Sequence, residues 1–164
     1  MRAERIEPGP GQESVWDYPR PPHAERTTKH IRVMLAGVTV ADTNRSVKVM
    51  ETSHPPTYYI PHEDVAHGVL SPAARSTVCE FKGRAVYHHV TAGGVERRNA
   101  AWSYPDPLDP YGEIAGHIAF YPSMMDECSV DGEPVIPQPG DFYGGWVTSD
   151  VVGPFKGGPG TLGW

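Results

Sequence analysis

The sequence offers no stretch from which a long helix could be built. Glycine and proline, with 18 residues each among 164, have roughly twice their usual share and interrupt the chain throughout. The longest segment without either, residues 38–54, has 17 residues and contains the turn-forming residues 42–46. This excludes helical bundles and coiled coils, and it leaves a chain of short strands and ordered loops.

Several classes of function also lack their sequence signals. The net charge is −6, from 14 basic and 20 acidic residues, and no basic stripe is present. We therefore expect neither nucleic-acid binding nor attachment to an anionic membrane. No apolar run approaches the roughly 20 residues that span a bilayer, and the first residues hold no secretion signal. These absences predict a soluble, cytoplasmic protein in which Cys79 and Cys128 are free thiols.

Metal and cofactor motifs are missing as well. His62 and His67 are five residues apart, whereas the H-E-x-x-H metal motif needs a spacing of four, and neither cysteine belongs to a C-x-x-C pair. His54 and His117 could become ligands only through tertiary contacts. The chain also lacks G-x-S-x-G, a P-loop and G-x-G-x-x-G. We expect no metal and no cofactor.

Composition divides the chain into three zones. Residues 1–30 are proline-rich around Trp16 and Tyr18, which fits an extended arm or a disordered tail equally well. Residues 31–136 alternate in polarity and predict a single β domain. Residues 137–164 combine glycine and proline with five large aromatic rings, which indicates an ordered strap on the domain or on a second copy, and so allows a homodimer.

The middle zone predicts a mainly β, barrel-like domain of seven to eight short strands, with short helical turns only near residues 63–67 and 108–117. A hairpin is expected at Ala36-Gly37 and another at residues 92–94. The segments that suggest these strands are residues 31–35, 38–40, 47–51, 57–60, 77–81, 84–90, 95–104, 117–121 and 127–130.

Two of these strands carry candidate site residues. If the strand at residues 77–81 continues to Gly83, alternation puts Glu80 and Lys82 on the same face of it. The same rule puts Trp102 and Tyr104 on one face of the strand at residues 95–104. If both sets point inward, the interior holds a carboxylate, an ammonium, an indole and a phenol. Buried charge of this kind serves a ligand or a structural ion pair. An exposed cross-strand pair on a solvated face is the open alternative.

Beyond these two strands, the chain resembles a known family, domain of unknown function 427. The resemblance lies in YYIP at residues 58–61 with Asp64, CEFKG at 79–83, AAWSYP at 100–105, HIAFYP at 117–122 and VDG at 130–132. The flanks ESVWDYP at 13–19, FYGGW at 142–146 and GPFKGGPG at 153–160 resemble the longer form of bacterial members. Phe81 departs from the pattern, because a tryptophan is common there.

The resemblance implies a small β-tent fold and no established reaction. Some labels of the family refer to nucleotidyl transfer, but this chain lacks a Gly-Ser pair followed by paired metal-binding aspartates. Three functions stay open: a small-molecule binding module, an enzyme with Glu80 and Lys82 as an acid/base pair, and an interaction domain that docks through its aromatic tail. The first is favoured, with a pocket lined by Tyr59, Glu80, Lys82, Trp102, Tyr104 and Tyr121.

Overall fold

The computed structural model describes residues 4–140 and 142–164, and it confirms the mainly β class: 45% of the chain is strand and 8% is helical. Residues 1–3 of the predicted arm and Asp141 of the predicted strap lie outside the described residues. All helical turns among the described residues are short 3-10 helices. They are η1 (Val15–Asp17), η2 (His62–Asp64), η3 (Gly112–Ile114) and η4 (Pro122–Met124).

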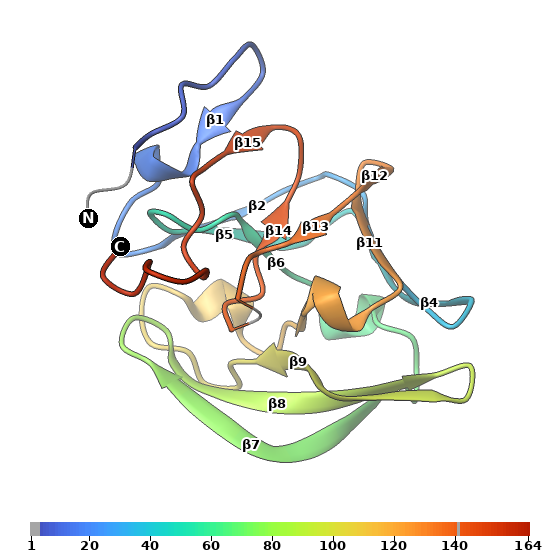
Figure 1. Cartoon of the computed structure of the whole chain (residues 1–164). Helices are drawn as coiled ribbons and strands as arrows, with labels where there is room; N and C mark the ends of the chain where they lie inside the picture. Colours follow the sequence, from blue (N-terminus) through green and yellow to red (C-terminus); the bar gives the residue numbers. More distant parts are fainter. Residues whose placement is uncertain (1–3, 141) are drawn as a thin grey trace.

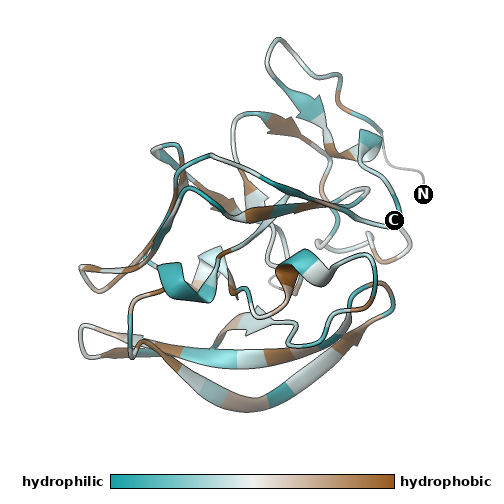
Figure 2. Cartoon of the chain, turned by 180° about the vertical axis from the view of Figure 1, so that it is seen from behind, coloured by the Kyte–Doolittle hydropathy of each residue, from teal (hydrophilic) through white to brown (hydrophobic). Residues whose placement is uncertain are grey.

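The strands form several small sheets, and the described residues contain no closed barrel (Figure 1). A four-stranded sheet with the order β10-β9-β8-β7 forms the lower layer of the molecule in Figure 1. Its strands are β7 (Leu70–Cys79), β8 (Gly83–Ala92), β9 (Val95–Ser103) and β10 (Ala119–Phe120). Seen from behind in Figure 2, hydrophobic and hydrophilic residues alternate along its long hairpin, as expected for a sheet with one face covered.

The other sheets lie across from this layer. A second four-stranded sheet has the order β12-β11-β3-β4, and a three-stranded sheet has the order β2-β5-β6. The strands of the second sheet are β3 (Ile31–Leu35), β4 (Val38–Thr43), β11 (Glu127–Val130) and β12 (Glu133–Pro134). Those of the third are β2 (His23–Arg26), β5 (Val47–Met50) and β6 (Thr57–Tyr59). The predicted hairpin at Ala36-Gly37 joins β3 to β4.

One short ladder joins the two ends of the chain, and another lies within its C-terminal part. The strand β1 (Glu13–Ser14) pairs in parallel with β15 (Val151–Val152), and β13 (Ile136–Pro137) pairs with β14 (Trp146–Val147). The Trp16 indole also donates a hydrogen bond to the Pro154 carbonyl at 2.8 Å. The N-terminal arm and the residues after 136, which we call the C-terminal tail, therefore pack against each other.

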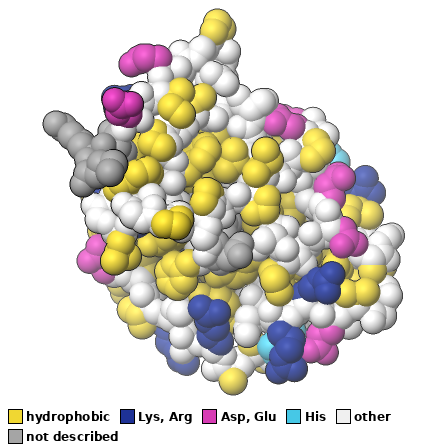
Figure 3. Space-filling view, in the orientation of Figure 1, with side chains coloured by type: hydrophobic (Ala, Val, Ile, Leu, Met, Phe, Trp, Pro, Cys, Tyr) yellow, Lys and Arg dark blue, Asp and Glu magenta, His cyan; other side chains and the backbone are white. Residues whose placement is uncertain are grey.

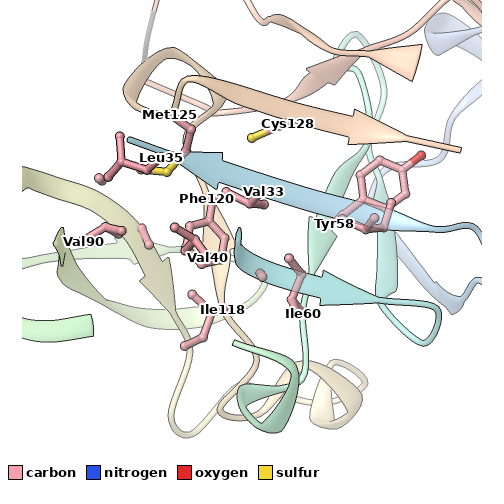
Figure 4. Close-up of a cluster of buried hydrophobic side chains, with 14 of the residues drawn as sticks. Val33, Leu35, Val40, Tyr58, Ile60, Val90, Ile118, Phe120, Met125 and Cys128 are labelled. Atoms are coloured by element: carbon pink, nitrogen blue, oxygen red, sulfur yellow. The ribbon is translucent and has the colours of Figure 1, made fainter. Parts of the chain in front are cut away.

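The main hydrophobic core lies between the sheets (Figure 4). Alternation along β3 sends Ile31, Val33 and Leu35 inward, each with no exposed surface, while Arg32 faces solvent. Each such side chain contributes about 1.5–3 kcal/mol by leaving water. The side chains labelled in Figure 4 are Val33, Leu35, Val40, Tyr58, Ile60, Val90, Ile118, Phe120, Met125 and Cys128.

Several predicted strands have different bounds, among them residues 117–121, of which only Ala119–Phe120 form a strand. For one strand the difference shapes the site. The sequence predicts a strand over residues 77–81, but β7 already ends at Cys79, and Glu80, Phe81 and Lys82 form the turn to β8. Gly83 has φ +101°, a conformation that favours glycine and allows the chain to reverse here. The strand also begins earlier than predicted, because Pro72 and an irregular register between Pro72 and Ser76 hide its alternation.

None of the described helices is both long and apolar enough to cross a membrane.

Candidate functional site

All six side chains nominated from the sequence line one cleft. It has a volume of about 290 Å³ and lies between the β7–β8 turn, the aromatic face of β8 and β9, and the C-terminal tail. Figure 3 shows that hydrophobic side chains gather over the N-terminal arm and the C-terminal tail, and that Lys and Arg lie mainly toward the β7–β8 side. The six residues are Tyr59, Glu80, Lys82, Trp102, Tyr104 and Tyr121.

The floor of the cleft is aromatic. Trp102 on β9 lies with its ring centroid 4.6 Å from that of Tyr121, and its indole N–H donates to the Tyr59 hydroxyl at 3.3 Å. Tyr104, just beyond β9, lies 6.2 Å from Tyr59, and Tyr87 stacks on Tyr121 at 6.5 Å. These rings are at least nine-tenths buried. The floor therefore presents ring faces and edges on which a flat apolar group can pack.

The phenols of this floor are hydrogen-bond donors at neutral pH. Burial is the main reason that the pKa of Tyr59, of Tyr104 and of Tyr121 is raised above its ordinary value. Each hydroxyl therefore stays protonated, and the Tyr121 hydroxyl donates a hydrogen bond to the Phe142 carbonyl at 3.1 Å. Among the described residues, the Tyr104 hydroxyl has no hydrogen-bond partner, so it is available to a ligand.

Glu80 and Lys82 lie in the β7–β8 turn, so strand alternation does not govern them. Lys82 is 9% exposed, and its Nζ lies 5.8 Å from the centroid of the Tyr104 ring. Glu80 is exposed. No ion pair within 4.0 Å joins these two residues. Both line the cleft, but the turn holds the ammonium inside and leaves the carboxylate at the rim.

The opposite wall comes from the C-terminal tail and was not predicted residue by residue. Gln138 is central to it: its Nε2 donates to the Lys156 carbonyl at 2.7 Å and to His54 Nδ1 at 3.0 Å, and its Oε1 accepts from the Gly145 N–H at 3.0 Å. The His54 ring in turn meets Tyr143 edge-on at 4.6 Å. The aromatic composition of the tail was the only signal in the sequence that this wall existed.

The tail lies directly on the aromatic floor at Gly144. This residue has φ +70°, and a Cβ there would come within 2.6 Å of the Trp102 ring and 2.9 Å of the Tyr121 ring. Only glycine allows the main chain to pass so close. The sequence predicts that the aromatic rings of the tail pack on the domain. Trp146 does so and has no exposed surface, whereas Phe142 is 55% exposed.

His54 is the buried titratable group of this wall. Its pKa is lowered to about 4, first by burial and then by the positive charges of Lys156, Arg20 and Lys82. The imidazole is therefore neutral at physiological pH. Nδ1 accepts the hydrogen bond from Gln138, which leaves the proton on Nε2, 3.7 Å from a carboxylate oxygen of Glu51.

The described residues contain no group of three or more His, Cys, Asp or Glu side chains placed to hold a metal ion. His88 and His89 are neighbours on β8 and make separate contacts, with the Ser103 hydroxyl and the Asn99 N–H respectively. What the cleft offers chemically is an aromatic surface, phenol donors and ammonium groups.

Iodoacetamide added to the folded protein is expected to alkylate Cys79 and to spare Cys128. Cys79 is partly exposed and lines the cleft. Cys128 is 3% exposed, and burial raises the pKa of its thiol, so the reactive thiolate is scarce there. Peptide mass spectrometry measures both rates, and unfolding in urea should make them similar. Equal rates in the folded protein would contradict the burial of Cys128.

A protein-family model matches residues 23–131, and its description is domain of unknown function (DUF427). No curated protein matches the chain. The matched segment supplies the aromatic floor and the β7–β8 turn, whereas Gln138, Tyr143 and Lys156 lie beyond it. The cleft is thus built jointly by the matched domain and by the tail that follows it.

Proposed function

The chain belongs to the DUF427 family, and from the cleft of this member we propose that the protein binds a small organic molecule. The observation that carries the proposal is the convergence of the six nominated side chains on one cleft. They come from β6, the β7–β8 turn, the end of β9 and the segment after β10. Packing of a hydrophobic core gives no reason to place an ammonium group and an unbonded phenol in the same cleft. A ligand site uses such polar groups to orient the bound molecule.

The size and lining of the cleft support a ligand with a flat apolar body. Ligand sites are concave, mainly apolar and aromatic, with a few polar groups that orient the bound molecule. Trp102 and Tyr121 supply the apolar surface, and Tyr104 and Lys82 supply polar groups. The alternative enzyme, with Glu80 and Lys82 as an acid/base pair, has less support because the two side chains form no ion pair and Glu80 is exposed.

The test is a variant that fills the cleft. Thr77 on the edge strand β7 lines the cleft, whereas its neighbour Ser76 is exposed and does not. Thr77→Trp should place an indole in the cleft, and Ser76→Trp adds the same group on the other face of the strand. Both variants should fold, because an edge strand leaves room for the added ring.

Binding is measured on the full chain by NMR with a library of small aromatic fragments. Wild-type protein and Ser76→Trp should show shifts at Trp102 and Tyr121, and bound fragments should slow the alkylation of Cys79. Thr77→Trp should lose these shifts and this protection. The proposal fails if fragments bind elsewhere, if none binds, or if Thr77→Trp binds them as wild type does.

A further inference from the structure

Two ammonium groups line the cleft, and neither is paired with a side chain of the Asp and Glu residues that the structure describes. Among the described residues, no Asp or Glu side-chain oxygen lies within 4.0 Å of Nζ of Lys82 or of Lys156. Lys82 meets the Tyr104 ring at 5.8 Å, and Lys156 meets the Tyr143 ring at 5.5 Å and donates to the main-chain oxygen of Trp164 at 3.2 Å. The other two lysines differ: Lys29 is paired with Asp150 at 3.0 Å and Lys48 with Glu13 at 3.4 Å.

The carboxylates that do line the cleft are engaged or remote. Glu51 lies 3.6 Å from Nε of Arg20, which balances its charge, and its carboxylate is 3.7 Å from Nε2 of the neutral His54. Glu80 is exposed at the rim, where water screens it. The ammonium of Lys82 is therefore a buried charge of the cleft that no side chain of the described Asp and Glu residues balances.

We propose that the cleft binds an organic oxyanion, with its carboxylate or phosphate between Lys82 and Lys156 and its flat apolar body against Trp102 and Tyr121. This inference rests on the proposed function and specifies the class of ligand. The buried ammonium of Lys82 is costly unless a charge or hydrogen bonds compensate it, and its one cation–π contact, with Tyr104, compensates only in part. An anion supplies what is missing, and the Tyr104 hydroxyl adds a donor to it.

The neighbouring groups agree with this polarity. Both lysines lie near enough to His54 to lower its pKa, so the field at this end of the cleft is positive. Gln138 and His54 are occupied with each other and with the tail, and they place no further acceptor against the ammonium groups.

Matched pairs of ligands test the charge separately from the shape. Isothermal titration calorimetry on the full chain compares phenylacetate with phenylacetamide and 2-naphthoate with 2-naphthamide, and it adds phenyl phosphate to separate phosphate from carboxylate. Each acid should bind at least ten-fold more tightly than its amide, the ratio expected for a charge-assisted hydrogen bond. Comparing the Kd of phenylacetate with that of phenyl phosphate shows whether the cleft prefers a carboxylate or a phosphate.

Four substitutions then locate the effect. Lys82→Met and Lys156→Met should each reduce the preference for the acid at least several-fold, while Lys29→Met, which removes the same charge outside the cleft, should leave it unchanged. Lys82→Arg keeps the charge and should keep the preference. Thermal melting verifies that each variant is folded.

The outcomes separate the two proposals. Equal affinity for acids and amides, or an acid preference that survives both lysine-to-methionine changes, overturns the oxyanion site and leaves a neutral binding cleft. If neither acids nor amides bind and the fragment library also finds no binder, the proposed function fails as well.

Discussion

Replacing Trp146 with alanine is expected to lower the free energy of unfolding by about 3–5 kcal/mol. The side chain has no exposed surface, and its ring lies 5.3 Å from that of Tyr58 in the main core. Its indole N–H also donates to the Phe120 carbonyl at 3.1 Å, and truncation leaves that buried carbonyl without this donor. Such a loss is a large part of the 5–15 kcal/mol that stabilises a typical domain.

Phe142 is the matched control, because it lies in the same tail but is 55% exposed. Phe142→Ala should change stability by less than about 1 kcal/mol. Urea denaturation followed by circular dichroism measures both variants without relying on tryptophan fluorescence. Similar losses for the two would show that the tail contributes to stability as a whole and that Trp146 is not its anchor.

Acidification from pH 7 to pH 4 is expected to destabilise the protein by about 3 kcal/mol through His54 alone. An unfolded histidine takes up its proton near pH 6.5, whereas in the folded protein the pKa of His54 is lowered to about 4. Between these values the unfolded state binds more protons, so stability falls as the pH falls, by about 1.4 kcal/mol per pH unit. Above about pH 6.5 the residue makes no difference.

The variant His54→Gln removes this dependence. Its unfolding free energy should fall less steeply than that of wild type between pH 6.5 and 4, and His23→Gln, at an exposed position, should follow wild type. A remaining slope is expected, because burial also lowers the pKa of His88. The carboxyl groups of Asp64 and Asp150, whose pKa values are lowered, act only at more acidic pH. Identical slopes for His54→Gln and wild type would refute the burial of a neutral imidazole.

The elements that the sequence predicted well are those with local alternation. In β3 the inward and outward residues follow strictly, and the Ala36-Gly37 turn is marked by glycine, so both strands of this hairpin could be predicted. The shared face of Trp102 and Tyr104 followed from the same rule. These features depend on neighbours in sequence, which is why a single sequence reveals them.

The turn at residues 80–82 and the tail wall depend on distant contacts. Glu80 and Lys82 were placed on one strand face, whereas the strand ends before them and only Lys82 is buried. His54 and Gln138 are 84 residues apart, and nothing local to either predicts their hydrogen bond. The cleft could be anticipated as a set of residue types, but its second wall required the tertiary structure.

The parallel ladder between β1 and β15 has a consequence for the order of folding during synthesis. Glu13 and Ser14 are synthesised long before their partners Val151 and Val152. Trp16 likewise precedes Pro154, whose carbonyl accepts its hydrogen bond, by 138 residues. The hairpins β3–β4, β7–β8 and β8–β9 can form earlier, because their strands pair with nearby segments. Residues 13–16 therefore leave the ribosome well before their partners and are among the last to acquire native contacts, whereas β2 of the same arm can pair earlier with β5.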